Sequence, residues 1–371
     1  MRFWSTRHRW LFVLVLVGSV AAISQPFCAR LLAAQTFLGK LSGAKEQPQT
    51  AKPVEEELQL PSALGPIRAR LYRPAGRGAH RAIVVGHGVH YQGIDERRLV
   101  PFARALAQSG LVVLTPELVD LADYRLTTSS VDRIAAAVGY LAARRDLVEG
   151  GRVGLLGFSF AGGLSLVAAE RPELATQLDY VVSVGGHHSL DRVFRFLLTN
   201  ELETPRGNVK FKAHDYGLAV ILYAYLDEFL PEAEVTPTRD AIRAWLQEDR
   251  TRARGCAESL TGEGARLFRL LEAGKLAELS PELEAVVEKH RAELSALSPR
   301  GRLKNIRAPV YLLHGSLDSV IPASEAEFTS LELAQNAHEL LVTPLIEHVE
   351  VNHKASLGEQ WALLAFMARL F

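Results

Sequence analysis

A serine lies between two phenylalanines in the stretch VGLLGFSFAGG, residues 153–163. The residues before Ser159 form an apolar, strand-like run and those after it are helix-like, which predicts a sharp strand-to-helix turn. Gly157 and Ala161 flank the serine two positions away, and small residues suit the strained backbone and close helix packing of such a turn. The free N–H groups at the start of the helix favour negative charge nearby. The pattern therefore predicts nucleophilic catalysis by the hydroxyl of Ser159.

The residues Gly157-Phe158-Ser159-Phe160-Ala161 resemble the nucleophile elbow of the α/β-hydrolase family, in particular its serine esterases and dienelactone hydrolases. The family pattern ends in glycine, where this chain has Ala161, which is also small. The resemblance covers about 54–186 and 304–371. It implies the α/β-hydrolase fold, a chain order of serine, acid and histidine, and no cofactor.

A serine hydroxyl needs a general base, and the base needs a carboxylate that orients it. The segment LLHGSLDSVIP is similar to the acid-bearing segment of the family and offers Asp318, for which a turn or capping carboxylate is the alternative interpretation. His348 and His353 are the candidate bases. We favour His348 because it directly follows an apolar run, whereas His353 lies in a polar turn. His338 precedes that run and so falls at its wrong end.

The oxyanion of an acyl-transfer reaction needs two preorganised N–H donors. The amide of Phe160, next to the nucleophile, is the first. The turn His87-Gly88-Val89 resembles the His-Gly-X turn of the family, which implies the amide of Val89 as the second. The side chain of His87 is expected to shape this loop. The candidate residues of the substrate pocket are His87, Phe158, His187 and His214, with structural roles as the alternative for each.

Apolar runs alternate with helix-like segments along most of the chain. This predicts an α/β protein with a mostly parallel central sheet covered by helices and preceded by an antiparallel hairpin. The helix-prone segment 187–303 lacks clear strand runs, and we interpret it as a cap over the carboxyl ends of the strands that sets specificity; a remote appendage is the alternative. The expected organisation is 1–34 leader, 35–53 linker, 54–186 first core part, 187–303 helical cap insertion and 304–371 second core part.

The N-terminus predicts export. Basic residues precede an uncharged apolar run, Trp10 to Ile23, which is the pattern of a secretory signal and is short for a membrane span. Cleavage could follow SVAAIS or ARLLAAQ. An uncleaved N-terminal membrane anchor is the alternative, and we favour cleavage. The protein is therefore expected to be periplasmic or extracellular, or anchored to a membrane.

Composition and missing motifs exclude other classes. The 42 Lys and Arg balance the 42 Asp and Glu, which gives no electrostatic reason to expect a nucleic-acid partner. Only Cys28 and Cys256 are present, so a disulfide framework is not expected. The adjacent His187 and His188 do not predict a metal site, because neighbouring residues rarely chelate one ion together. The sequence also has no dinucleotide-binding glycine motif and no phosphate-loop lysine.

The sequence thus predicts a serine hydrolase that cleaves a carboxylic ester or related acyl bond through Ser159, His348 and Asp318, without a cofactor or metal. Its substrate is expected to be a small-molecule or acyl ester. A peptidase or thioesterase with the same residues is one alternative. A non-catalytic binding protein of the cell envelope with this fold is another. An epoxide or haloalkane hydrolase is not expected, because these need an aspartate nucleophile.

Overall fold

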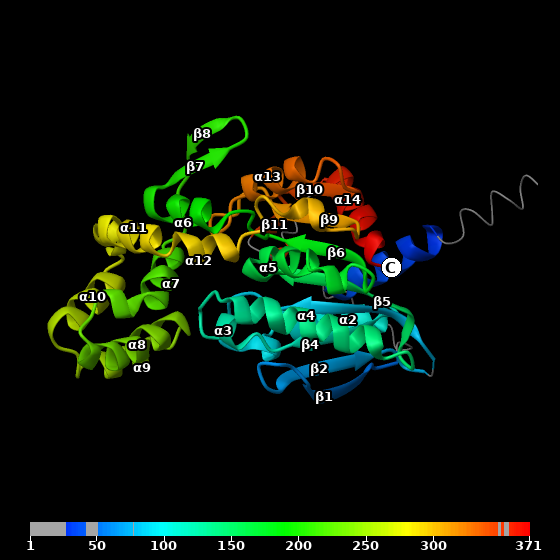
Figure 1. The fold of residues 1–371 in the computed structure, drawn as a ribbon, viewed down its shortest axis with the longest axis horizontal. Helices are drawn as coiled ribbons and strands as arrows, with labels where there is room; N and C mark the ends of the chain where they lie inside the picture. Colours follow the sequence, from blue (N-terminus) through cyan, green and yellow to red (C-terminus); the bar gives the residue numbers. More distant parts are fainter. Residues whose placement is uncertain (1–26, 42–50, 77, 348–349, 352–355) are drawn as a thin grey trace, which may run out of the picture.

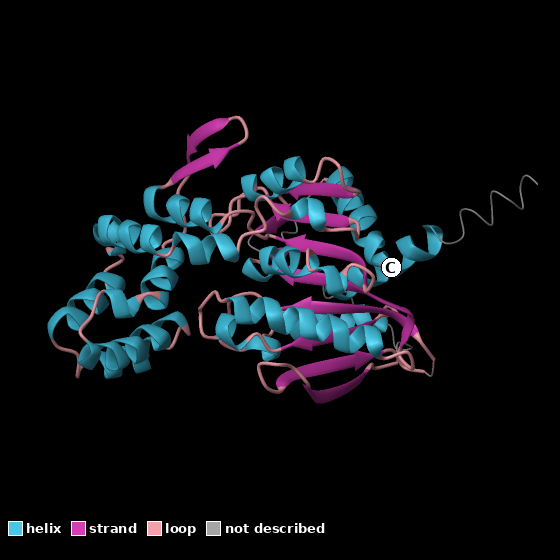
Figure 2. Ribbon diagram, viewed as in Figure 1, coloured by secondary structure: helices cyan, strands magenta, loops and turns pink. Residues whose placement is uncertain are grey.

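A mostly parallel sheet forms the centre of the protein (Figures 1 and 2). The structure is a computed structural model that describes residues 27–41, 51–76, 78–347, 350–351 and 356–371. Within these ranges the main sheet has eight strands, of which β1 and β2 run antiparallel to their neighbours. In spatial order the strands are β1 (Val54–Leu60), β2 (Ile67–Arg73), β4 (Val112–Pro116), β3 (His80–Gly86), β5 (Val148–Phe158), β6 (Leu178–Val184), β9 (Val310–Gly315) and β10 (His338–Thr343).

The central strands are buried because helices cover both faces of the sheet. β4 is buried along its whole length, and β6 at all but one position, as expected of strands covered on both sides. One face packs against α4 (Thr128–Ala143) and α5 (Phe160–Ala169), and the other against α2 (Leu99–Gln108) and α14 (Leu357–Met367). The predicted fold class and the predicted N-terminal hairpin are confirmed.

The strand order reverses beside β3. From β3 the chain passes through α2 to β4 on one side, and after α4 it returns to β5 on the other side. The loops that follow β3 and β5 therefore leave the sheet in opposite directions. Open α/β sheets bind ligands in the crevice that such a reversal creates at the carboxyl ends of the strands.

A helix spans residues 27–41, where the sequence predicts the end of a leader and the start of a linker. Ala34 and Phe37 in this helix are fully buried in the core that also contains α2 and α14. The ring of Phe37 meets that of Phe102 on α2 edge to face, with centroids 5.2 Å apart. This helix runs across the predicted boundary at residue 35, with buried apolar residues on both sides of it. Residues 1–26, with the apolar run, lie outside the described part of the chain.

The insert between β6 and β9 is mainly helical, as predicted. It also contains a small hairpin that the sequence does not predict, because the strand residues are exposed or half-exposed and show no apolar run. Its elements are α6 (Leu190–Thr199), β7 (Glu201–Thr204), β8 (Gly207–Lys210), α7 (Tyr216–Ala224), α8 (Glu232–Leu246), α9 (Arg250–Ala257), α10 (Gly262–Glu272), α11 (Ser280–Lys289) and α12 (Arg291–Ala296). Figure 1 shows the insert to the left of the sheet, beyond the ends of β5 and β6.

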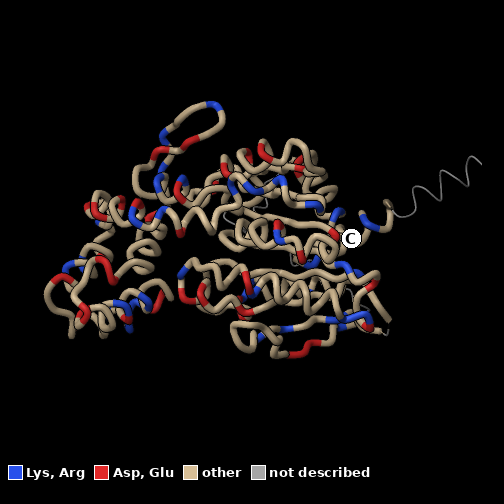
Figure 3. The backbone as a smooth tube through the Cα atoms, in the orientation of Figure 1, with Lys and Arg blue, Asp and Glu red and all other residues tan. Residues whose placement is uncertain are grey.

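Basic and acidic residues alternate along the backbone of the insert and of the core helices (Figure 3). In the described ranges, no helix combines the length and the apolar composition that crossing a bilayer requires.

Candidate active site

Ser159 occupies a strained turn between β5 and α5. Its backbone has φ +54° and ψ −131°, a left-handed φ that residues other than glycine seldom adopt. The amide of Ser159 donates a hydrogen bond to the carbonyl oxygen of Val184, at the end of β6, over 2.8 Å. The turn is thus tied to the neighbouring strand, and it joins a strand to a helix as the sequence predicts.

The glycines around Ser159 allow α5 to lie directly against the sheet. A Cβ atom at Gly157 would lie 2.2 Å from the carbonyl oxygen of Ala161, in the first turn of α5. A Cβ atom at Gly162 would lie 3.0 Å from the Cα atom of Gly186. Ala161 fits without strain against β3, since even a Cβ atom added at Gly86 would lie 3.5 Å from the Cβ atom of Ala161, an ordinary van der Waals distance.

The loop after β3 meets Ser159 across the crevice. A Cβ atom at Gly88 would lie 3.4 Å from the Cβ atom of Ser159, so this loop and Ser159 are in contact. Within the described residues, the amides of Val89 and Phe160 donate to no backbone carbonyl. Two amide donors on the two sides of the crevice are therefore unused by the backbone, as an oxyanion hole requires.

His87 holds the loop after β3 through both of its ring nitrogens. Its Nε2 atom accepts a hydrogen bond from the amide of Leu118 over 2.9 Å, so the proton of the neutral ring lies on Nδ1. Nδ1 then donates to the carbonyl oxygen of Gly88 over 2.8 Å. His87 also lines the cavity described below. Its side chain fixes the loop, which is the role expected for it.

Asp318 lies in a buried turn after β9, two strands away from β5. Its Oδ1 atom accepts hydrogen bonds from the amides of Val320 and Ile321 over 2.9 and 3.0 Å. The buried ring of His314, at the end of β9, donates from Nε2 to the carbonyl oxygen of Ile321 over 2.7 Å. His314 thereby fixes the turn that carries Asp318. The sequence analysis missed this role, although His314 stands in the quoted segment LLHGSLDSVIP.

The candidate bases lie beyond the described residues. Both His348 and His353 fall in the gaps 348–349 and 352–355. The described strands β11 (Ile346–Glu347) and β12 (Glu350–Val351) pair with each other on the two sides of His348. The choice between the two histidines therefore stays a prediction.

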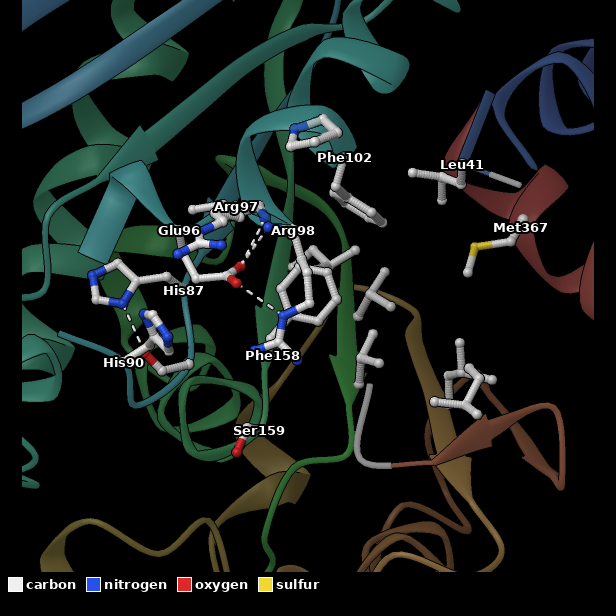
Figure 4. A pocket seen from close by; sticks show the side chains of 18 of the residues that line it. Leu41, His87, His90, Glu96, Arg97, Arg98, Phe102, Phe158, Ser159 and Met367 are labelled. Carbon is white, nitrogen blue, oxygen red and sulfur yellow. Dashed lines mark hydrogen bonds and ion pairs between the residues drawn. The ribbon is translucent and has the colours of Figure 1, made fainter. Parts of the chain in front are cut away.

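A cavity of about 440 Å³ opens beside Ser159 (Figure 4). It extends from the loop after β3 along the face of the sheet that α2 and α14 cover. Phe158, a predicted pocket residue, lines this cavity and packs edge to face against Phe102 with ring centroids 4.9 Å apart. The volume is in the range of small-molecule sites, ~300–1,000 Å³.

The sequence matches no family model and no curated protein. Among solved structures, a rice cell wall degrading esterase from Xanthomonas oryzae, in a mutant form, superimposes with a TM-score of 0.54 at 14% identity, over 88% of this chain and 92% of that one. An esterase from Pyrococcus furiosus has a TM-score of 0.51 at 14% identity, over 86% and 91%. The chain has the α/β-hydrolase fold. It spans only 41% of the acylaminoacyl peptidase from Pyrococcus horikoshii, which it matches over 87% of its own length at 12% identity and a TM-score of 0.49.

In this α/β-hydrolase fold, two of the predicted pocket residues lie elsewhere. His187 is fully buried behind α5, where its Nε2 atom bonds the carbonyl oxygen of Leu297 over 2.9 Å. His214 is exposed on the insert, and its amide donates to the carbonyl oxygen of Ser319 over 2.9 Å. Neither side chain lines the cavity, because one is held under the helix and the other lies on the surface.

A buried polar cluster, which the sequence did not reveal, anchors the insert to α13 (Ser324–Glu332). The guanidinium of Arg192 donates from Nε to Oε1 of Glu325 over 2.5 Å and from Nη2 to Nδ1 of His188 over 3.1 Å. The other ring nitrogen of His188, Nε2, then donates to Oε2 of Glu332 over 2.7 Å. The carboxylate of Glu332 also accepts the amide of Gly301, at the far end of the insert. Both ends of the insert are thus held by one helix of the core.

No group of three or more His, Cys, Asp or Glu side chains in the described residues is arranged to hold a metal ion. His188 in particular is fully engaged by Arg192 and Glu332.

The buried histidines His87 and His187 are expected to make the fold sensitive to acid. Burial lowers the pKa of each side chain from 6.5 to about 4. Between about pH 4 and pH 6.5, these two histidines are protonated in the unfolded chain and neutral in the folded chain. The free energy of unfolding should therefore fall as the pH drops from about 6.5 to about 4, by about 3 kcal/mol for each histidine. Urea denaturation across this pH range measures the effect.

The variant His87→Gln separates this contribution from that of the carboxyl groups. It should reduce the loss of stability between neutral and acid pH relative to the unmodified chain, because the buried imidazole with the lowered pKa is removed. If the free energy of unfolding depended on pH identically in His87→Gln and in the unmodified chain, His87 would not be a source of the acid sensitivity.

Proposed function

We propose that this protein is a serine hydrolase that cleaves a carboxylic ester or a related acyl bond through an acyl-enzyme. The observation that carries the proposal is Ser159, held at φ +54° between β5 and α5 beside a cavity. Backbone strain of this kind persists where the surrounding structure enforces it, and it is concentrated at functional sites. The names of the two esterases with similar folds favour an ester over an amide.

In the proposed mechanism, the hydroxyl oxygen of Ser159 attacks the carbonyl carbon of the substrate. His348 removes the hydroxyl proton and passes it to the leaving group, and Asp318 fixes the tautomer of His348 and stabilises its charged form. The amides of Phe160 and Val89 stabilise the oxyanion. Water then attacks the acyl-enzyme by the same route and releases the acid. No cofactor takes part.

Labelling with a fluorophosphonate tests the proposal. The probe should modify the folded, full-length protein at Ser159, as located by mass spectrometry of its peptides, because only an activated serine attacks phosphorus at a useful rate. A folded protein that neither reacts with the probe nor hydrolyses p-nitrophenyl acetate would support a binding role instead.

His348 and His353 are compared by mutation. Because His348 directly follows the strand-like run, His348→Ala should lower kcat by at least a hundredfold more than His353→Ala, measured with p-nitrophenyl acetate. Thermal melting of both variants controls for folding. Equal losses of kcat in the two variants, or a larger loss in His353→Ala, would contradict the choice of His348 as the base.

We also propose export, with the residues before helix 27–41 acting as a signal or as a membrane anchor. The basic residues and the run Trp10–Ile23 support a signal. Cleavage after residue 35 would cut helix 27–41 just ahead of the fully buried Phe37. We therefore expect cleavage near SVAAIS, residues 19–24, so that the whole helix is retained.

N-terminal sequencing of the protein from the expressing cell tests this expectation. A mature chain that begins before residue 28 would agree with it. A chain that begins at residue 36 would contradict it. An intact N-terminus in the membrane fraction would favour the anchor over cleavage.

A further inference from the structure

The cavity beside Ser159 is closed by two helices from opposite ends of the chain. Leu38 and Leu41 of helix 27–41 and Leu363 and Met367 of α14 line it, although more than three hundred positions separate the two helices in the sequence. Figure 4 shows Leu41 and Met367 on the side of the cavity opposite Glu96 and Arg97. These four apolar side chains form the wall of the cavity opposite Glu96 and Arg97, which we call the far wall.

The polar residues of the cavity gather at the other end. His90, Glu96 and Arg97 line it near the loop after β3, on the same side as His87 (Figure 4). Glu96 is held by Arg98, whose Nε atom donates to Oε1 of Glu96 over 2.8 Å. The cavity is thus polar where the loop after β3 meets Ser159 and apolar where the two terminal helices meet. An acyl ester has the same division, with a polar carbonyl group at one end and an alkyl chain at the other.

We propose that this cavity binds an unbranched alkyl chain, so that the preferred substrates are esters of medium- to long-chain fatty acids. The inference rests on the proposed hydrolase function and names its substrate class. The chain runs from the carbonyl group at Ser159 across Phe158, Val184 and Leu313 on the face of the sheet, and its end contacts helix 27–41 and α14.

Packed aromatic rings support the wall that contacts the chain. The rings of Phe37, Phe102 and Phe158 pack edge to face in sequence, with centroid distances of 5.2 and 4.9 Å. They connect helix 27–41 through α2 to the residue that precedes the nucleophile. A preformed apolar wall favours an alkyl chain because little ordering of the protein opposes the burial of each methylene group.

The helical insert plays no part in this selection. Within the described residues it contributes no side chain to the cavity. This differs from the expectation that the insert sets specificity. The length of the acyl chain is instead selected by helix 27–41 and α14.

Burial of a methylene group contributes about 0.8 kcal/mol, which corresponds to a roughly fourfold gain in kcat/KM for each added carbon until the cavity is full. The test uses the full-length protein and p-nitrophenyl acetate, butyrate, octanoate and dodecanoate, below their solubility and micelle limits. The value of kcat/KM should rise along the series by at least a hundredfold and then level off. A flat or falling series would overturn the inference.

Substitutions at the far wall provide a second test of the inference. Met367→Trp and Leu363→Phe should lower the ratio of kcat/KM for dodecanoate to that for acetate by tenfold or more, because each larger side chain shortens the cavity. Leu32→Trp is the matched control, since Leu32 lies on helix 27–41 but is 64% exposed and does not line the cavity. Equal losses for both substrates in well-folded far-wall variants would refute the assignment, as would an altered ratio in the control.

A binding measurement separates this inference from the proposed function. The variant Ser159→Ala should still bind a fluorescent fatty-acid analogue, and Met367→Trp should weaken that binding by tenfold or more. Binding without any hydrolysis or probe labelling would overturn the hydrolase and keep the alkyl site. Hydrolysis of acetate without such binding would keep the hydrolase and overturn the alkyl site.

Discussion

Replacing Ser159 by alanine is expected to lower kcat/KM for p-nitrophenyl esters by a factor on the order of 10⁴ to 10⁶, which is what loss of an activated serine nucleophile costs. The reason is that Ser159→Ala removes the atom that attacks the carbonyl carbon. The cavity and the loop after β3 are left in place, so a small residual rate above that in water should persist. Steady-state kinetics and fluorophosphonate labelling measure both parts of the prediction.

Ser165→Ala is the matched control for Ser159→Ala. Ser165 is a fully buried serine of α5 that does not line the cavity. Its removal should change kcat/KM by less than about threefold. A loss of activity in Ser159→Ala no greater than that in Ser165→Ala would rule out Ser159 as the nucleophile.

Replacing Asp318 by asparagine is expected to lower kcat by about 10⁴ with little loss of stability, the effect known for loss of the orienting acid. Asparagine keeps an oxygen that accepts the hydrogen bonds from the amides of Val320 and Ile321, so the turn after β9 can form. It cannot supply the negative charge that stabilises a protonated histidine. Kinetics with p-nitrophenyl acetate and urea denaturation of the same preparation separate the two effects.

Asp249→Asn controls for the substitution itself. Asp249 also accepts a backbone amide, that of Arg252 over 3.0 Å, but it does so at the start of α9 in the insert. This variant should retain full activity. If Asp318→Asn kept activity within tenfold of the unmodified chain, Asp318 would be only a turn-forming carboxylate.

The elements that carry Ser159 could be predicted from sequence because their signals are local. The strand, turn and helix around Ser159 lie within eleven consecutive residues, and small side chains mark the close contacts. The hairpin and the parallel strands likewise show their burial in short runs of apolar residues.

The features that could not be predicted depend on residues distant in the sequence. The ion pair between Arg192 and Glu325 joins positions 133 residues apart, and neither residue stands in a motif. Leu41, in the cavity wall, falls in a stretch that the sequence predicts to be a linker, and no local pattern places it beside Met367. The tautomer of His87 depends on the amide of Leu118, which sequence pattern does not place beside it.

The anchoring of the insert at α13 limits how the molecule can open. Rotation of the entire helical segment as one body would have to separate Arg192 from Glu325, both of which are buried. It would also break the hydrogen bonds that Oε2 of Glu325 accepts from the amides of His188 and Ser189, each over 2.8 Å. We therefore expect motions of the insert to arise between Arg192 and Gly301 and not at its attachment to α13.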